Sequence, residues 1–337
     1  MEPEPRPVRQ PVVLEPLARV FVDAYRQQAV GTPAPGRTAG GSASTQRDRL
    51  LPPVPGDDGF GSHPDVAEDR LALPGARGER NLVRIVRPTD ADEPLPVILY
   101  IPGPIWTPGA VPPQRDFERD LVLGTDAAVV VLDTPQQRDE CYPETIERLH
   151  AVLDWIAAQG AEDGLDPRRI AVVGVSTGAN LAAGLTLLAK RRGGPEMVQQ
   201  VLICPATDAA ADTPSYREFA EGYFLDASAM TAFWDRYVPD AALRTQSTAS
   251  PSRAAGAELA GLPPTLIVTA EADVLRDEGE AYAARLRAAG VAVVSLCYHG
   301  TVHGFVAFDA LRASHASTAA RIQVVDTLHV ALHARRG

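Results

Sequence analysis

The chain has 337 residues, of which 45% are hydrophobic and 22% charged, and its formal net charge at pH 7 is −11. This length allows one large buried core, and the balance is ordinary for a soluble globular protein. The acidic surplus argues against a surface of clustered Lys and Arg, so no nucleic-acid partner is expected. The sequence has no run of about 18 apolar residues and no apolar signal segment at its start, so we expect a cytoplasmic protein with no membrane partner.

The first 65 residues differ from the rest of the chain. Apolar residues recur at helical spacing on one face, among them Phe21 and Tyr25, which predicts an amphipathic helix over about residues 14–29. A stretch rich in Gly, Pro and Ser follows over residues 31–63, without periodicity. Such a stretch is typical of a lid or a mobile connector. Residues 1–65 are therefore predicted to form an N-terminal cap helix and a flexible loop.

From Val66 onward, short β-branched strands alternate with helices. The predicted strands are 82–86, 97–101, 128–132, 170–173, 201–204, 266–269 and 293–298. The predicted helices between them are 142–159, 179–191 and 276–289. Apolar runs this short, separated by helices, indicate a mostly parallel sheet that is buried on both faces. The predicted fold class is therefore α/β.

Residues 206–262 interrupt this alternation, because they carry helical patterns with aromatic side chains and no strand. An insertion after the carboxyl end of a strand lies over the crevice in which open α/β sheets bind their ligands. We therefore divide the chain after the N-terminal segment into a core of residues 66–205 and 251–337 and a helical cap insertion of residues 206–250.

The most informative motif is Gly-Val-Ser-Thr-Gly at residues 174–178. A buried strand runs into this Gly-x-Ser-x-Gly pattern, and a helix of small residues follows it. The glycines are needed because the turn is sharp and the serine backbone is strained. The helix directs its first N–H groups at any oxyanion formed beside Ser176. This strand–turn–helix context makes Ser176 a strong candidate nucleophile.

In a site of this kind the acid and the histidine follow the serine along the chain. Asp273 comes just past a predicted strand, where its carboxylate can accept from a histidine N–H. His303 follows the last predicted strand and precedes a glycine and Phe305, which allows a tight loop with the imidazole exposed and the phenyl ring anchored below. Asp277, at the start of the next helix, is expected to cap that helix. Ser176, Asp273 and His303 are therefore the predicted nucleophile–base–acid triad.

Together these motifs resemble the hormone-sensitive-lipase-like family of α/β-hydrolases, which includes bacterial carboxylesterases and plant carboxylesterase-like proteins. The resemblance covers residues 66–335. Beyond the serine motif it includes Leu-Pro-Pro-Thr at residues 262–265, Asp-x-Leu-x-Asp-Glu at residues 273–278 and His-Gly-Phe at residues 303–305. The family implies an α/β-hydrolase fold with a mostly parallel eight-stranded sheet flanked by helices, a helical cap, and hydrolysis of short acyl esters. It implies Ser176 as nucleophile, His303 as base and then acid, and Asp273 as the residue that orients the imidazole.

The segment that forms the oxyanion hole in this family departs from its pattern. Where the family has His-Gly-Gly-Gly, this chain has Pro-Gly-Pro-Ile at residues 102–105. Proline has no N–H, so Pro104 cannot donate to an oxyanion. The candidate oxyanion residues are Thr177, Ile105 and Gly103. Loss of one donor typically costs about 10²–10³ in rate, which leaves activated esters and thioesters as substrates.

Three aromatic residues, Trp106, Phe224 and Trp234, are candidates for an apolar substrate pocket, although core packing explains each of them equally well. The sequence has no Gly-x-Gly-x-x-Gly, Walker or His-Glu-x-x-His pattern, so no cofactor and no metal are expected. The expected partner is a small-molecule substrate. The sequence leaves open whether the protein forms a homodimer.

Three functions fit these observations. The leading hypothesis is a serine hydrolase or acyl-transfer enzyme that acts on a small, fairly apolar ester, lactone or thioester. The second keeps Ser176 and His303 as a proton relay for elimination, cyclisation or rearrangement, chemistry that needs acid–base groups more than a full oxyanion hole. Its support in the sequence is the proline-containing segment 102–105. The third is a non-catalytic small-molecule binding protein, against which the presence of His303 argues.

Overall fold

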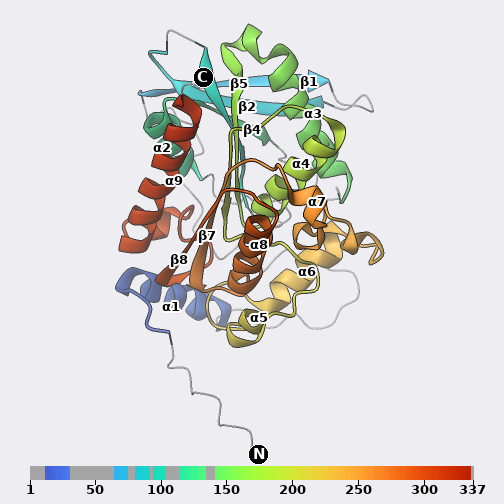
Figure 1. The fold of residues 1–337 in the computed structure, drawn as a ribbon. Coiled ribbons are helices and arrows are strands. Elements are labelled where there is room, and N and C mark those ends of the chain that lie inside the picture. The colour runs from blue at the N-terminus through green and yellow to red at the C-terminus, as the bar shows by residue number, and fades with distance from the viewer. Residues whose placement is uncertain are drawn as a thin grey trace, which may run out of the picture.

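The computed structural model of the protein describes residues 12–30, 64–74, 80–91, 94–103, 114–133 and 141–334. Within these ranges the chain forms one eight-stranded sheet with helices on both faces (Figure 1). The strands are β1 (Val66–Pro74), β2 (Arg80–Pro88), β3 (Leu95–Ile101), β4 (Ala128–Asp133), β5 (Leu165–Val175), β6 (Gln199–Ile203), β7 (Thr265–Ala272) and β8 (Val293–Val302). Their order across the sheet is β1-β2-β4-β3-β5-β6-β7-β8. The α/β class with a mostly parallel sheet is therefore confirmed.

The sheet is parallel from β4 to β8 and antiparallel at its other end. β1 pairs antiparallel with β2, and β2 pairs antiparallel with β4, while the remaining neighbours run parallel. The central strands are buried on both faces, which explains why they consist of continuous β-branched and aliphatic runs. Because the parallel strands all point one way, their carboxyl ends meet at a single edge of the sheet.

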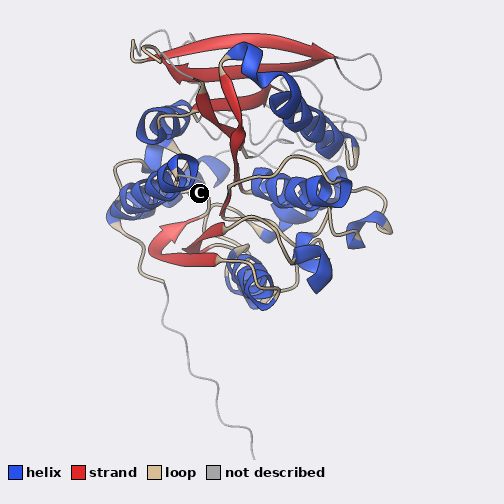
Figure 2. Cartoon of the chain, turned by 45° about the horizontal axis from the view of Figure 1, so that its top comes forward, coloured by secondary structure: helices blue, strands red, loops and turns tan. Residues whose placement is uncertain are grey.

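The helices cover both faces of the sheet (Figure 2). They are α1 (Pro16–Val30), α2 (Arg115–Thr125), α3 (Glu144–Gln159), α4 (Thr177–Arg192), α5 (Pro214–Glu218), α6 (Ala227–Tyr237), α7 (Gly256–Leu259), α8 (Arg276–Ala288) and α9 (His315–His333). Short 3-10 turns lie at Gly160–Asp163, Leu243–Thr245, Pro251–Arg253 and Asp309–Leu311. Helices α2 and α9 pack together on one face, and α3, α4 and α8 lie on the other (Figure 1). None of the described helices has the length and apolar character that a membrane crossing requires.

All seven strands predicted from the sequence are present, and β2, β5, β7 and β8 extend furthest beyond their predicted ranges. Strand β1 was missed because it lies at the edge of the sheet and alternates charged with apolar residues irregularly, so only Val66 and Leu73 are buried in it. Helix α9 was also missed, because its apolar residues are spread around its circumference and leave little periodicity. Helix α2 carries charged residues along much of its length and was not predicted either.

Helices α1, α5 and α6 lie toward the lower end of the molecule in Figure 1. The segment that enters α1 is held to the core by Glu15. Its backbone N–H donates to the Gly300 carbonyl at 2.8 Å. Its carboxylate accepts from the first two N–H groups of α9, at His315 (3.1 Å) and Ala316 (3.3 Å). A carboxylate in this place satisfies free helix N–H groups and offsets the positive end of the α9 dipole.

Candidate active site

Ser176 stands at a sharp turn between β5 and α4. Its φ of 57° and ψ of −119° place a non-glycine residue in a strained region of backbone space. The turn is so closely packed that the residues two positions before and two positions after Ser176 must be glycines. A Cβ at Gly174 would lie 2.5 Å from the Cα of Ala179, and a Cβ at Gly178 would lie 2.6 Å from the Pro102 carbonyl oxygen. Packing therefore explains the Gly-x-Ser-x-Gly pattern.

The side chains of Ser176, His303 and Asp273 form a continuous hydrogen-bonded row. Ser176 Oγ lies 2.8 Å from His303 Nε2, and His303 Nδ1 lies 2.7 Å from Asp273 Oδ2. An ionised carboxylate only accepts hydrogen bonds, so we place the ring proton on Nδ1, where it donates to Asp273. The lone pair of Nε2 then faces the serine hydroxyl. All three residues are buried, with exposed fractions of 6%, 4% and 1% in the order given.

Each member of this row follows a different parallel strand. Ser176 follows β5, Asp273 follows β7 and His303 follows β8. The second oxygen of Asp273, Oδ1, accepts the N–H of Leu275 at 2.9 Å. Both carboxylate oxygens are therefore fixed, which holds the imidazole in one orientation.

The loop that carries His303 differs from its prediction in one respect. Gly304 has a φ of 72°, which lets the chain turn sharply after the histidine, and Phe305 is fully buried as expected. The imidazole, however, is 4% exposed, so the expectation of an exposed ring was wrong. Strand β8 continues to the residue before His303, which places the ring at the buried edge of the sheet rather than at a loop tip.

Asp277 does not cap α8, contrary to the sequence prediction. The N-cap position is Leu275, which has no side-chain cap. The Asp277 carboxylate instead accepts the Ser215 N–H of α5 at 2.8 Å and forms an ion pair with Arg276 at 2.9 Å. Asp277 therefore ties α5 to the helix that follows Asp273.

Cys204, at the end of β6, lies beside the Asp273–His303 pair and was not singled out from the sequence. One potential ligand atom from each of these three residues lies within 4.8 Å of the other two. Ligands of a tetrahedral zinc ion lie about 3.4 Å apart, given bonds of about 2.1 Å. His303 Nδ1 and Asp273 Oδ2 are hydrogen-bonded at 2.7 Å, so this set fits a hydrogen-bonded row better than a metal centre. Burial and the Asp273 charge raise the pKa of the Cys204 thiol well above its ordinary value, which keeps the thiol neutral.

Glu278, in the first turn of α8, is a buried carboxyl group close to the site. It is 2% exposed, and its Oε1 accepts the Thr207 N–H at 2.6 Å. Burial raises the pKa of Glu278 well above its ordinary value, and the charges of Asp208 and Asp273 raise it further. Both effects favour the neutral form of the Glu278 carboxyl, which lies against Thr207 in the segment after β6. Its place in the segment 273–278 was visible in the sequence, but its burial was not.

Two of the three oxyanion candidates lie within the described residues. Thr177 is the first residue of α4 and is 4% exposed. Gly103 follows β3 and lies directly against the serine, since a Cβ on it would be 2.9 Å from Ser176 Cβ and closer still to the Val175 carbonyl oxygen. Ile105 lies outside the described residues.

The predicted substrate-binding aromatics have different surroundings. Phe224 has a φ of 83°, which is unusual for a bulky residue, and its ring centroid lies 5.0 Å from that of Phe21 in α1 and 5.2 Å from that of Phe308. Phe224 thus joins the segment between α5 and α6 to α1 and to the loop after β8. Trp234 is 1% exposed and packs among the aromatic rings of α6. Trp106 lies outside the described residues.

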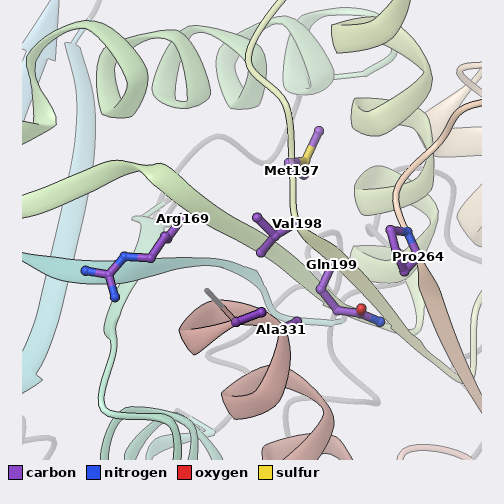
Figure 3. A pocket seen from close by; sticks show the side chains of 7 residues that line it. Arg169, Met197, Val198, Gln199, Pro264 and Ala331 are labelled. Carbon is purple, nitrogen blue, oxygen red and sulfur yellow. The ribbon is translucent and has the colours of Figure 1, made fainter. Parts of the chain in front are cut away.

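A cavity of about 400 Å³, whose lining side chains are shown in Figure 3, lies where β5, β6 and β7 begin. It is lined by Arg169, Met197, Val198, Gln199, Pro264, Ala331 and Ala334. These residues come from the first half of β5, the start of β6 and the two residues before it, the residue before β7, and the end of α9 with the residue after it. Ser176 follows the carboxyl end of β5, so this cavity is separate from the hydrogen-bonded row.

Comparison with known proteins agrees with this geometry. A family model described as the alpha/beta hydrolase fold matches residues 98–307. The carboxylesterase NlhH of Mycobacterium tuberculosis is 39% identical over 227 residues, which are 67% of this chain and 71% of the relative. An ethyl acetate hydrolase of Pseudomonas putida is 32% identical over 256 residues, 74% of this chain and 78% of the relative.

Solved structures extend the likeness over nearly the whole chain. The crystal structure of a thermostable esterase from Pseudomonas putida ECU1011 has a TM-score of 0.84 and 36% identity, and the match covers 97% of this chain and 100% of that one. The chain therefore belongs to the hormone-sensitive-lipase-like family of α/β-hydrolases and is a carboxylic-ester-hydrolase-like enzyme.

Proposed function

We propose that this chain hydrolyses small, fairly apolar carboxylic esters, with Ser176 as the nucleophile. The observation that carries the proposal is the unbroken row from Ser176 Oγ through the two ring nitrogens of His303 to Asp273, at 2.8 and 2.7 Å. A serine hydroxyl is a weak nucleophile until an adjacent base removes its proton, and this row supplies that base already oriented.

The reaction proceeds in two halves. In the first, His303 Nε2 takes the Ser176 proton as Oγ attacks the ester carbonyl carbon, and Asp273 stabilises the imidazolium that forms. Nε2 then returns the proton to the leaving alcohol oxygen as the C–O bond breaks, which leaves an acyl group on Ser176. In the second half, Nε2 deprotonates a water molecule that attacks the acyl carbon, and the proton returns to Ser176 as the acid leaves.

The tetrahedral intermediates carry negative charge on the former carbonyl oxygen. We assign its stabilisation to the Thr177 N–H at the start of α4 and to the backbone at Gly103, which lies against the nucleophile. The N-terminal end of α4 adds a favourable dipole. This arrangement places no requirement on Pro104, which cannot donate.

The proposed substrates have short acyl groups and small alcohols. The relative named ethyl acetate hydrolase supports this size range. We assign Phe224, together with Trp106, to the apolar wall of the substrate pocket, since Phe224 contacts both α1 and the loop that follows His303. Trp234 packs within α6 and is assigned a structural role. The substrate is the one partner that the mechanism requires, because the triad residues all come from one chain.

The proton-relay alternative is not favoured. The matched relatives include proteins named as a carboxylesterase and an esterase, and among the described residues no contact at Ser176 calls for elimination or cyclisation chemistry. A binding protein without catalysis has no need of a strained serine at φ 57° that faces an oriented imidazole.

The test is turnover of p-nitrophenyl acetate, butyrate and octanoate by the wild type and by Ser176→Ala. We expect turnover that is fastest with the short esters and absent from Ser176→Ala. Ser317→Ala, which alters a fully buried serine in α9, is the matched control and should keep wild-type rates. Equal rates in the wild type and Ser176→Ala would refute the proposal.

A further inference from the structure

Two buried side chains form a hydrogen-bonded chain behind the backbone that lies against the nucleophile. Tyr100, near the end of β3, is fully buried, and Gln114, the N-cap residue of α2, is 4% exposed. The Tyr100 hydroxyl donates to Gln114 Oε1, and Gln114 Nε2 donates to the Gly103 carbonyl oxygen at 2.7 Å. The oxygen of Gly103 only accepts, so the amide nitrogen of Gln114 must face it, which fixes the orientation of the amide.

The Tyr100 hydroxyl is held as a hydrogen-bond donor. Burial and the charge of Glu118 raise the pKa of Tyr100 well above its ordinary value, so the hydroxyl keeps its proton and remains a donor. Its ring lies edge-on to Phe117 with centroids 5.8 Å apart, and the backbone oxygen of Gln114 accepts the Glu118 N–H at 2.9 Å. Tyr100 is therefore anchored in β3, and Gln114 is anchored at the start of α2.

The peptide unit that contains the Gly103 carbonyl has no N–H group that could also hold it in place. The peptide after Gly103 ends in a proline nitrogen, so its carbonyl is its one hydrogen-bonding group. A carbonyl that turned toward the serine would repel the negative charge that develops on the substrate. On its other side Gly103 packs against the serine turn, since a Cβ at Gly103 would lie 2.9 Å from Ser176 Cβ.

We propose that Gln114, oriented by Tyr100, is a positioning residue for oxyanion stabilisation. It holds the Gly103 carbonyl away from the developing charge and keeps the Gly103 backbone in register with Ser176. This role rests on the proposed ester hydrolysis.

The expected effect is on the chemical step rather than on substrate binding. A neutral ester carbonyl gains little from an oxyanion site, so KM should change less than twofold. Because removal of a direct oxyanion donor costs about 10²–10³ in rate, displacement of its support in Gln114→Leu should lower kcat by about 10- to 100-fold. Tyr100→Phe keeps the amide but frees its orientation, so a smaller loss of a few-fold is expected.

The experiment measures kcat, KM and the inhibition constant of a trifluoromethyl ketone for the wild type, Gln114→Leu and Tyr100→Phe. The ketone forms an oxyanion on the serine, so its affinity should weaken in parallel with kcat/KM. Gln200→Leu is the matched control, since Gln200 is also fully buried and hydrogen-bonded to Thr186 (2.8 Å) and Thr265 (3.2 Å), but belongs to β6. It should lose stability and keep kcat.

Gln114→Glu adds a readout that a purely structural role would not change. The introduced carboxyl can donate to the Gly103 oxygen only when it is protonated, and burial favours that form. Its kcat relative to the wild type at the same pH should therefore rise as pH falls from about 8 to about 6.

The outcomes separate this proposal from the proposed function. If the wild type turns over esters and Ser176→Ala does not, while Gln114→Leu and Tyr100→Phe keep wild-type kcat and ketone affinity, the positioning role is refuted and hydrolysis stands. If Gln114→Leu does not fold, an unchanged kcat in Tyr100→Phe and a pH-independent ratio in Gln114→Glu refute it. If the wild type shows no more turnover than Ser176→Ala, hydrolysis fails and the positioning role fails with it.

Discussion

Gly103→Ala is expected to disturb the site by moving two backbones apart. A Cβ at Gly103 would lie 2.9 Å from Ser176 Cβ and closer still to the Val175 carbonyl oxygen, whereas ordinary contacts begin at 3.4 Å. The end of β3 must therefore move from the serine turn by at least about 0.5 Å, and by more at the carbonyl oxygen. Displacements approaching 1 Å in a catalytic site can cost about 10²-fold in rate. Overpacking of this kind costs about 1–3 kcal/mol of stability.

We expect Gly103→Ala to lower kcat by about 10- to 100-fold and the free energy of unfolding by about 1–3 kcal/mol. Ester turnover gives the first quantity and urea denaturation the second. Gly256→Ala is the control, because a Cβ there meets no atom within 4 Å and the residue begins α7, so it should gain roughly 0.5–1 kcal/mol at full activity. A Gly103→Ala enzyme with wild-type kcat and stability would show that the close approach to Ser176 does not matter.

Three further substitutions test other parts of the account. Asp273→Asn should lower kcat by about 10⁴-fold, because an amide nitrogen facing Nδ1 favours the wrong imidazole tautomer, and a smaller loss than 10-fold in steady-state turnover would contradict this. Glu278→Gln tests the buried acid. The raised pKa of Glu278 stabilises the fold below the ordinary value of 4.5, and this stability is lost as pH rises toward the folded-state pKa. In urea denaturation the variant should therefore gain stability relative to the wild type between about pH 4.5 and pH 7. A constant difference across that range would show that Glu278 is ionised in the fold. Glu15→Ala should cost about 1 kcal/mol by thermal unfolding, because it removes the acceptor for two N–H groups of α9, and an unchanged melting temperature would contradict that role.

The parts of the site that follow from local chain geometry could be predicted from the sequence. The serine turn was visible because its glycines are forced by contacts with adjacent segments, such as Gly178 against Pro102. Asp273 and His303 could be chosen because each comes after an apolar strand. The structure places His303 within hydrogen-bond distance of Ser176, and Asp273 within hydrogen-bond distance of His303. The order of serine, acid and histidine along the chain supplied the remaining evidence for choosing Asp273 and His303.

The parts that depend on contacts between distant segments could not be predicted. Gln114 has no sequence feature that links it to Gly103, and the two meet because α2 starts beside the end of β3. Cys204 ends a predicted strand, and its position at the carboxyl edge was the available signal, but its distance to Asp273 depends on the order of β6 and β7 in the sheet. Burial of Glu278 depends on the segment after β6, where the Thr207 N–H donates to its carboxyl group.

The corrected expectations have the same origin. Asp277 was expected to cap α8, since acidic residues are common at helix starts, but the Ser215 N–H of α5 is a competing donor. His303 was expected to be exposed because glycine follows it, and the extra length of β8 buries it instead.

Direct detection of an acylated Ser176 tests the central claim. Wild-type enzyme mixed with p-nitrophenyl butyrate and quenched in acid during the first turnover should yield a peptide containing Ser176 with the added mass of one butyryl group. The same peptide from His303→Ala should remain unmodified on that timescale, because no base removes the serine proton. Turnover of the ester by the wild type without any acylated Ser176 peptide would contradict nucleophilic catalysis by this residue.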